Sequence, residues 1–572
     1  MKNSFQATLD KIKRDAESGK QKKTETSKNT GSSDVVLYVH QDQLNLKVFP
    51  NEIIRKKPRL VLIESTADAS YLPFHKKKLV LEWSARRHFA IEAVKEGFPV
   101  VYLQTDTSSD KALKVVLKKN SNANIICMQP AEFTPRRRFE ALKSEFDSRF
   151  EIIPNTFFMA DPSKWAEKVR SGYRMEFFYR EMRKHTGYLM DNGKPAGGGW
   201  NYDDKNRQSL PSEIEVSDFT GFKPDEVTRE VQNVIDELFP EHFGSTDGFR
   251  YAVTRKEALE VLEHFIDSKL TYFGPYQDAM AAGDPFLFHS LLSPCLNLGL
   301  LTAREVCDAV LNAYEKAAQS NKDGNKSQNR SGKKHSAKDN VIPLNSVEGF
   351  IRQILGWREY IRIYYEAMMP EVRESNFFSY KQTLPDLYWS ADTEMKCMQE
   401  AVESVRKHGY AHHIQRLMVL SNFSNLTASD PRKLLDWFWF AFVDAHEWVV
   451  LPNVLGMSTF ADGGVLASKP YIAGGNYIRK MSDYCSGCRY RVQDRTGEDA
   501  CPFNYLYWSF VDREREHLKK NPRIGFMLKT WNKKSEDEKE EIRKMSDKFI
   551  DNLKRYKQMD TAEKRKTDFL ES

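Results

Sequence analysis

Long apolar runs are absent from this sequence of 572 residues. No stretch approaches the roughly 18–20 consecutive apolar residues that a membrane-spanning helix needs, so we expect no membrane partner. The first six residues contain no apolar core of the kind that a secretory signal has. Cysteine is also scarce, with seven in the chain. Few cysteines without a secretory signal predict a reducing compartment, where clustered cysteines bind metal or react more often than they form disulfides.

Two common binding signatures are missing as well. The Gly-x-Gly-x-x-Gly fingerprint is absent, so an ordinary NAD-binding fold lacks its main support. A second Cys-x-x-Cys pair, which a zinc ribbon would supply, is absent too. The charge is nearly balanced, with 87 Lys and Arg against 80 Asp and Glu and a net charge of +7. This small excess indicates nucleic-acid binding only if the basic residues gather on one face, and so leaves that function open.

Short β-branched and apolar runs occur from residue 35 onward, with helical stretches between them. The runs are residues 35–40, 60–64, 100–103 and 124–128, and the helical stretches include residues 77–95 and 110–119. Strands that alternate with helices indicate a parallel α/β sheet. We therefore predict an α/β domain over residues 35–160.

Other segments complete the predicted organisation. Residues 1–34 are polar and charged, so we expect them to be largely disordered. Residues 161–235 hold Gly, Pro and Asn clusters and form an expected connector, and residues 236–530 have the helical pattern of a large all-α domain. Within it, residues 319–340 are poor in hydrophobic residues and predict a flexible insertion. Residues 531–572 predict a charged amphipathic helix, because apolar residues recur there at spacings of three and four: Ile542, Met545, Phe549, Leu553 and Tyr556.

Polar residues follow the first two predicted strands. Asp42 and Gln43 come after the first strand, and Glu64 ends the second. Ligands of open α/β sheets bind beyond the carboxyl ends of the strands. These three residues are therefore candidates for a ligand site, and solvated loop residues are the alternative.

The cysteines form a recognisable constellation. Cys485-Ser-Gly-Cys488 is followed by Cys501, which precedes a proline. A lone Cys-x-x-Cys pair fits a redox pair, half of a metal site or chance. The third cysteine favours a metal site, and the cysteine–proline step favours iron–sulfur over zinc. A four-cysteine site needs one more donor, for which the candidates are Cys127, Cys295, Cys307 and Cys397.

Several motifs together identify a family resemblance. They include residues 273–280 (Phe-Gly-Pro-Tyr-Gln-Asp-Ala-Met), 289–293 (His-Ser-Leu-Leu-Ser), 350–359 (Phe-Ile-Arg-Gln-Ile-Leu-Gly-Trp-Arg-Glu), 409–418, 451–457, 469–471 and 474–477, with 175–183 and 199–203 in the connector. From about residue 35 to 530 the chain resembles the iron–sulfur bacterial cryptochromes and photolyases, a branch that includes prokaryotic (6-4) photolyases. This resemblance implies the photolyase/cryptochrome fold, with an antenna-binding α/β domain and an all-α flavin domain.

The resemblance also implies three cofactors. A 4Fe–4S cluster would be held by Cys397, Cys485, Cys488 and Cys501. A 6,7-dimethyl-8-ribityllumazine antenna would lie in the α/β domain near Asp42, Gln43 and Glu64. One departure concerns this antenna, because Arg86 stands where relatives commonly have methionine.

The third implied cofactor is FAD, bound in the helical domain. Ser, Asn, Gln and Arg at helical spacing can hydrogen-bond a phosphate and a ring edge inside an apolar pocket. Taken singly, each such residue could equally be a helix cap or a surface pair. The positions implied near the flavin are His289, Ser290, Ser293, Asn297, Gln353, Trp357, Arg358, Asp444 and Asn453.

The implied activity is light-driven repair of UV-damaged DNA by electron transfer from photoexcited reduced FAD, with (6-4) lesions as the favoured substrate. The lesion would be flipped out of the duplex into a pocket. His412 and His413 are the implied catalytic pair, and His413 best matches the proton donor. Tyr471 and Tyr477 are implied lesion or DNA contacts. Trp389 and Trp437 are implied electron-relay residues, although an aromatic stripe such as that around Trp437 is also typical of a core.

Two other functions remain in view. One is a blue-light photoreceptor of the same fold that signals instead of repairing DNA. The other is a zinc-containing nucleic-acid-binding protein without catalysis. We expect a monomer in a bacterial cytoplasm, associated with the nucleoid. Organelle targeting stays open because residues 1–34 are rich in Lys, Ser and Thr, but they also contain acidic residues that such signals lack: Asp10, Asp15, Glu17 and Glu25.

Overall fold

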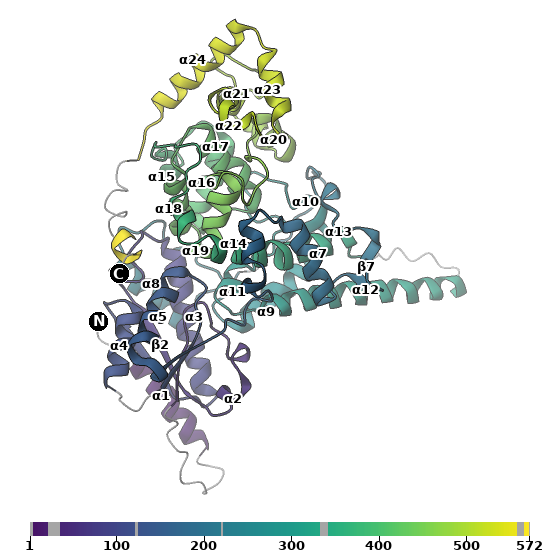
Figure 1. The fold of residues 1–572 in the computed structure, drawn as a ribbon. Coiled ribbons are helices and arrows are strands. Elements are labelled where there is room, and N and C mark those ends of the chain that lie inside the picture. Colours follow the sequence, from purple (N-terminus) through teal and green to yellow (C-terminus); the bar gives the residue numbers. More distant parts are fainter. Residues whose placement is uncertain are drawn as a thin grey trace.

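The computed structural model describes residues 4–20, 35–119, 124–218, 221–331, 341–556 and 566–570. A parallel sheet with its helices forms one part of the molecule, and a larger helical part lies beside it (Figure 1). This arrangement confirms the predicted fold class. No helix in these ranges is long and apolar enough to cross a lipid bilayer.

Five parallel strands form the sheet in the order β3-β2-β1-β4-β5. Their side chains are mostly buried on both faces, as is typical of parallel sheets covered by helices. The strand order reverses beside β1, and ligands of open α/β sheets bind at such a reversal. The strands are β1 (Val35–Tyr38), β2 (Arg59–Ser65), β3 (Val100–Thr105), β4 (Asn124–Met128) and β5 (Phe150–Ile153).

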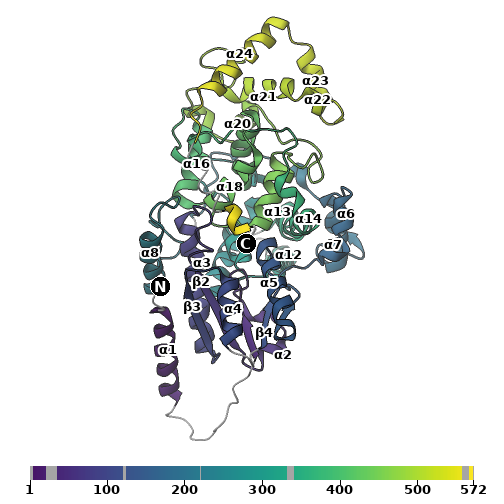
Figure 2. The same ribbon diagram turned by 60° about the vertical axis from the view of Figure 1, so that its left-hand side comes forward.

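Helix α3 (Lys76–Lys95) joins the two parts of the molecule. It packs along the sheet, and its first turn meets the helical part (Figure 2). Lys77 Nζ donates to the carbonyl oxygen of Lys407 at 2.7 Å. Lys78 Nζ donates to the carbonyl oxygens of Trp439 at 3.2 Å and Ala445 at 2.6 Å. Because a buried ammonium group needs such partners, these bonds hold the helix in one position on the helical part.

The N-terminal segment contains helix α1 (Ser4–Lys20), so the prediction that residues 1–34 lack structure is wrong for this stretch. Phe5 and Leu9, one helical turn apart, are both 1% exposed. The Phe5 ring meets Tyr102 edge-on at 4.8 Å, and Gln6 Oε1 accepts a hydrogen bond from the Tyr102 amide at 2.7 Å. One apolar face thus docks α1 on the sheet part. Residues 21–34 lie outside the described residues.

Helices dominate the remainder. The sheet part also holds α2 (Asn51–Ile54), α4 (Ser109–Lys119) and α5 (Phe133–Phe146), and the connector holds α6 (Ala166–Arg170), α7 (Met175–Thr186) and the short strands β6 (Met190–Asp191) and β7 (Lys194–Pro195). Helix α8 (Glu226–Leu238) packs against α3 beside the sheet part. The helical part contains α9 (Arg255–His264), α10 (Leu270–Tyr276), α11 (Ser293–Asn297), α12 (Ala303–Ser331), α13 (Leu344–Ile351), α14 (Glu359–Met368), α15 (Leu387–Ser390), α16 (Lys396–His408), α17 (Asn422–Leu426), α18 (Pro431–Ala441), α19 (Glu447–Leu451), α20 (Gly475–Met481), α21 (Pro502–Arg513), α22 (Arg515–Leu518), α23 (Gly525–Asn532) and α24 (Glu536–Asn552).

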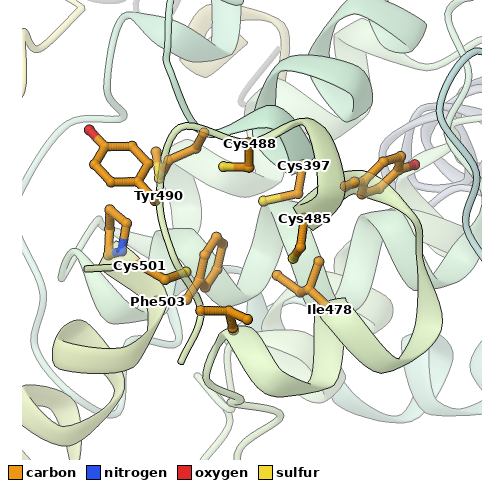
Figure 3. A pocket seen from close by; sticks show the side chains of 12 residues that line it. Cys397, Ile478, Cys485, Cys488, Tyr490, Cys501 and Phe503 are labelled. Atoms are coloured by element: carbon orange, nitrogen blue, oxygen red, sulfur yellow. The ribbon is translucent and has the colours of Figure 1, made fainter. Parts of the chain in front are cut away.

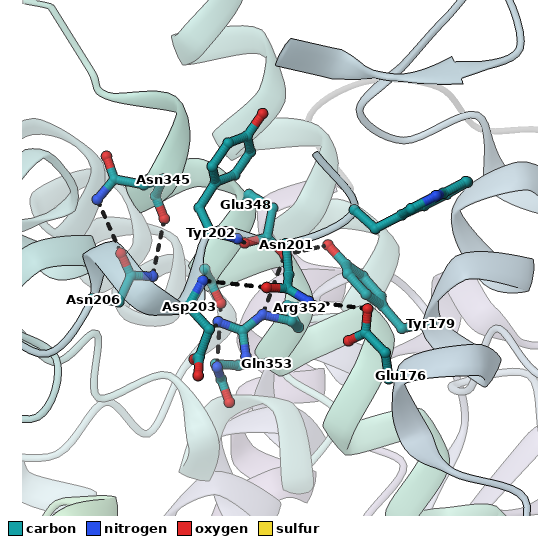
Figure 4. A network of polar contacts seen from close by, with 12 residues as sticks. Glu176, Tyr179, Asn201, Tyr202, Asp203, Asn206, Asn345, Glu348, Arg352 and Gln353 are labelled. Atoms are coloured by element: carbon teal, nitrogen blue, oxygen red, sulfur yellow. Dashed lines mark hydrogen bonds and ion pairs between the residues drawn. The ribbon is translucent and has the colours of Figure 1, made fainter. Parts of the chain in front are cut away.

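A buried polar network fastens the connector to α13 and to the segment after it (Figure 4). Glu348 accepts hydrogen bonds from Tyr179 Oη at 3.1 Å and from the Tyr202 amide at 3.0 Å. Arg352 Nε lies 3.2 Å from Glu348, and its Nη2 lies 3.1 Å from Asp203. Because the Glu348 carboxylate is buried, this cation and the two donors offset the cost of removing it from water.

Within the described ranges, four helical segments have π-type hydrogen bonding: η6 (Phe265–Lys269), η7 (Arg352–Arg358), η9 (Gln415–Ser421) and η10 (Pro452–Ser458). Such irregular turns are frequent at functional sites because they redirect side chains. Three of the predicted flavin residues lie in η7, and Asn453 lies in η10. Three of these four segments, η7, η9 and η10, therefore overlap the stretches that the motifs marked.

The predicted flexible insertion at 319–340 is partly helical. Helix α12 continues through Ser331 and projects from the body (Figure 1). The preceding part of α12, residues 303–318, contains five alanines and several long side chains that favour a helix, and the helix continues from there into the insertion. Residues 332–340 lie outside the described residues.

The C-terminal segment is only partly the amphipathic helix that its spacing predicts. Helix α24 packs on α21, with Ile542 buried, and ends at Asn552. Beyond it, Arg555 bridges to Pro385 and the Tyr556 amide donates to the Leu384 carbonyl oxygen at 3.1 Å. Residues 566–570 are helical and return to the sheet part (Figure 2).

Candidate functional site

Four cysteines surround one cavity in the helical part (Figure 3). Cys397 lies in the first turn of α16, and Cys485 lies in the short 3-10 helix after α20. Cys488 ends that 3-10 helix, and Cys501 caps the start of α21. The apolar wall includes Ile478 and Phe503. The structure thus brings Cys397, of the four open candidates, next to the other three cysteines.

The chemistry of this cavity fits a metal cluster. All seven cysteines are free thiols. Burial raises the pKa of Cys397 well above its ordinary value, and the three neighbouring cysteines raise it further. Burial also raises the pKa of Cys501, to about 12. Four thiolates this close need positive charge beside them, which a bound metal supplies as it displaces the thiol protons.

A polar group gathers around Asp444 in the helical part. Ser293 Oγ donates to Asp444 Oδ2 at 2.7 Å, and Asn297 Nδ2 donates to the Asp444 carbonyl oxygen at 2.9 Å. Arg416 Nη2 lies 3.1 Å from both carboxylate oxygens. The sequence predicted three members of this group as flavin-proximal residues, namely Ser293, Asn297 and Asp444, but it did not single out Arg416. Its position in the 409–418 motif, one helical turn after His412, was the available signal.

Three histidines lie together beside this group. The rings of His289 and His412 stack with centroids 4.6 Å apart, and His413 lies 5.3 Å from His289. Burial lowers the pKa of both His289 and His412 well below the usual value. Neither ring nitrogen of His412 has a hydrogen-bond partner among the described residues. These buried, unpaired nitrogens fit a site that a polar ligand completes.

His413 is the exposed member of this group. Its side chain is 49% exposed, and its Nε2 lies 3.2 Å from Asp278 Oδ1. Tyr477 is close to the same carboxylate, since burial and then the charge of Asp278 raise its pKa. Tyr471 lies nearer the connector, where burial raises its pKa and Arg207 opposes the shift. The predicted pair therefore has one buried and one exposed histidine, and Asp278 and Arg207 are neighbours that sequence reasoning missed.

The remaining predicted flavin residues have local partners. Arg358 is partly buried beside Phe158 and Trp448, with its guanidinium 4.5 and 5.2 Å from their ring centroids. Gln353 Nε2 donates to the Gly349 carbonyl oxygen at 3.3 Å, and Asn453 Nδ2 donates to the Val449 carbonyl oxygen at 2.8 Å. Ser290 Oγ accepts from the Leu292 amide at 3.4 Å, and Trp357 meets Tyr360 edge-on at 6.4 Å. Arg358 also reaches the helix that carries Asn297, because its Nη2 lies 3.5 Å from the Leu296 carbonyl oxygen.

The two predicted relay tryptophans belong to an aromatic series. Trp437 is fully buried, and its Nε1 donates to the Tyr388 carbonyl oxygen at 3.2 Å. The Tyr388 ring meets Trp437 edge-on at 5.1 Å. Trp389, the next residue, stacks on Tyr556 at 3.7 Å with an interplanar angle of 7°. Tyr388 thus connects the buried tryptophan with one that is partly exposed.

A second cavity opens at the carboxyl ends of β1 and β2. Its wall includes Tyr38, His40 and Gln41 from the first strand and the loop after it, Ile63 from the second, and Lys78, Glu82 and Arg86 from α3. Trp439 and His446 contribute from the helical part. A ligand site in this region was predicted, but on neighbouring residues.

None of the three predicted antenna residues lines this cavity. Side chains alternate along a strand, so Glu64 lies on the face opposite Ile63. There it pairs with Arg87 at 2.8 Å and accepts from Tyr102 Oη at 2.8 Å. Asp42 contacts His40 Nδ1 at 2.6 Å, and Gln43 Nε2 donates to the Met128 carbonyl oxygen at 3.2 Å. These contacts stabilise the sheet and its loops.

Comparisons with known proteins agree on one family. The sequence model of the family described as deoxyribodipyrimidine photo-lyase-related protein matches residues 37–251. A (6-4) photolyase from Agrobacterium fabrum is 41% identical over 507 residues, which cover 87% of this chain and 95% of that protein. A bacterial class III photolyase structure from Agrobacterium tumefaciens matches with a TM-score of 0.52 and 15% identity, over 93% of this chain and 100% of that one. A Synechocystis cryptochrome structure matches with a TM-score of 0.52 and 12% identity, over 90% and 98%.

The two solved structures establish the class of fold, that of photolyases and cryptochromes. With 41% identity over nearly the whole of a (6-4) photolyase, the chain belongs to the photolyase family. The resemblance drawn from the motifs is thereby confirmed, and membership implies FAD as a cofactor.

Proposed function

We propose that this protein is a DNA photolyase that repairs UV lesions in light, with the (6-4) pyrimidine photoproduct as its substrate. The observation that carries the proposal is the placement of His413, half-exposed and paired with Asp278 beside the buried His289–His412 stack. The 41% identity to a protein named (6-4) photolyase supports the same activity. FAD, when bound and reduced, supplies an electron in light.

The group around Asp444 is suited to hold the flavin. Asp444 is 6% exposed, and contacts with Ser293, Asn297 and Arg416 fix its position. Fixed donors and acceptors in a buried wall can orient a polar ring edge and exclude water from it. The unpaired ring nitrogens of His412 would complete their hydrogen bonding there.

His413 is the proposed proton donor to the lesion. Its ring contacts solvent on one side and a carboxylate on the other, which suits proton exchange near neutral pH. His412 and His289 remain neutral because burial lowers their pKa values, so neither competes as an acid. Tyr477 and Tyr471, both largely buried and both near Arg207, would form the wall beside a flipped base.

The four cysteines are proposed to hold a 4Fe–4S cluster that ties together three separate segments: α16, the loop after α20 and α21. Trp437, Tyr388 and Trp389 would carry electrons between the flavin and the surface. The cavity at the carboxyl ends of β1 and β2 is proposed to hold the ribityllumazine antenna, where its polar wall can hydrogen-bond a heteroaromatic ring.

A repair assay under blue light tests the activity. The reduced, anaerobically purified protein is given oligonucleotides with a (6-4) photoproduct or a cyclobutane dimer. We expect light-dependent restoration of the (6-4) substrate, lost in His413→Ala and kept in His185→Ala, which alters an exposed histidine of α7. No repair of either lesion by protein that still holds reduced FAD would refute the enzyme and favour a photoreceptor.

A further inference from the structure

The end of the chain occupies the second cavity. Phe569, in the helical stretch 566–570, lines this cavity with residues of the sheet part. Figures 1 and 2 show this stretch, marked C, at the junction of the sheet part and the helical part. After Tyr556 the sequence contains one aromatic residue, and it is Phe569.

The Phe569 ring lies between a ring and a cation. It stacks on Tyr71 with centroids 3.9 Å apart and an interplanar angle of 4°. The Arg138 guanidinium lies 4.2 Å from the Phe569 ring centroid, and its Nη2 donates to the Phe569 carbonyl oxygen at 2.5 Å. The parallel Tyr71 ring and the Arg138 guanidinium both contact the Phe569 ring at close range, so the slot is shaped for a flat ring.

A charged contact holds the start of the same stretch. Lys566 pairs with Asp436 of α18, and its Nζ lies 5.7 Å from the Trp439 ring centroid. Asp436 is 3% exposed, so its carboxylate depends on such a partner. The segment therefore has two anchors, a ring in the slot and a cation on the helical part.

The wall around the slot offers more polar groups than a phenyl ring can use. Asp68 Oδ1 is buried and has no hydrogen-bond partner in the part of the chain that the structure describes. Glu82, Glu132 and Arg86 also line the cavity. A hydrocarbon ring satisfies none of these groups, whereas a planar heteroaromatic ring with donors and acceptors would.

We propose that Phe569 is an internal occupant of this cavity, and that residues 566–570 and a planar heteroaromatic ligand exclude each other from it. That a planar ligand binds in this cavity rests on the antenna site proposed above. The segment then sets the occupancy of that site, because a ligand must first displace the Phe569 ring from Tyr71. A site that is free for about one-tenth of the time binds its ligand about tenfold more weakly.

Ligand titration of full-length variants tests the exclusion. The probe is 6,7-dimethyl-8-ribityllumazine, followed by its fluorescence anisotropy. We expect Phe569→Ala to lower the dissociation constant about tenfold and Phe569→Tyr, which keeps a stacking ring, to stay near the wild type. Phe526→Ala is the matched control, because Phe526 is 79% exposed and lies in α23.

Hydrogen exchange followed by mass spectrometry supplies a second readout. In the wild type, saturating ligand should speed exchange in residues 566–570, and Phe569→Ala should do so without ligand. Equal ligand affinity in Phe569→Ala and wild type would overturn the exclusion while leaving the antenna site standing. Absence of binding to either variant would overturn both, and the two failures are thereby distinguished.

Discussion

Gly475 is expected to be indispensable to the cysteine site. It opens α20, and a β-carbon added there would lie 2.8 Å from Cys501 Sγ and 2.8 Å from Val492 Cγ2. Its amide also donates to Asn504 Oδ1 at 3.0 Å, which fixes the backbone against the start of α21. Cys501 cannot move away without displacing a proposed cluster ligand, and Val492 cannot move away without displacing part of the cavity wall.

We expect Gly475→Ala to weaken the loaded site by about 1–3 kcal/mol, the usual cost of inserting a methyl group into a packed interior. That energy corresponds to about a 5- to 150-fold loss of affinity for the cluster. Iron and sulfide content per chain and visible absorbance after anaerobic purification report the loss, and thermal melting reports the destabilisation.

The matched control lies in the same site. Gly487 stands between Cys485 and Cys488, and a β-carbon added there would meet nothing within 4 Å. Gly487→Ala should therefore keep its iron and melting temperature. Equal iron content in both variants would refute the argument that close backbone approach at Gly475 shapes the site.

Two other predictions concern the cavity wall and the relay. Burial raises the pKa of Glu132 to about 7, so folding favours its protonated form. This group contributes about 3 kcal/mol to the free energy of unfolding. The contribution is fully present below about pH 4.5 and is lost as the pH rises through about 7. Glu132→Gln should remove this part of the fall in melting temperature between pH 5 and 8, and an unchanged slope would count against it. Trp437→Phe should slow light-driven reduction of bound flavin yet leave repair by chemically reduced protein intact; unchanged photoreduction would exclude Trp437 from the relay.

The sequence predicted local structure where one pattern dominated. The β-branched runs of β1 to β4 and the helical periodicity after residue 236 were sufficient for the fold class. Strand β5 was not foreseen, because Phe150–Ile153 is a four-residue strand that contains a glutamate. Helix α1 was missed because its charges hide the two apolar residues, Phe5 and Leu9, that dock it.

The candidate sites, like the fold, could be predicted where a local motif was present and not where residues distant in the sequence come together. The Cys-x-x-Cys pair and the histidine pair are visible as motifs, so their surroundings could be anticipated. Arg416 and Asp278 lie inside the quoted motifs, but their pairing with Asp444 and His413 could not be anticipated, because these partners lie 28 and 135 residues away. The predicted antenna residues do not line the second cavity, for a different reason. A strand end carries side chains to both faces, and the sequence alone does not say which face opens onto a cavity.

The position of helix α3 bears on energy transfer between two bound chromophores. Lys78 is anchored on the carbonyl oxygens of Trp439 and Ala445, which flank the segment that carries Asp444. Further along the same helix, Glu82 and Arg86 line the second cavity. A chromophore there and another at Asp444 would therefore have transition dipoles with a fixed mutual orientation, so that excitation could pass between them at a rate set by the fold.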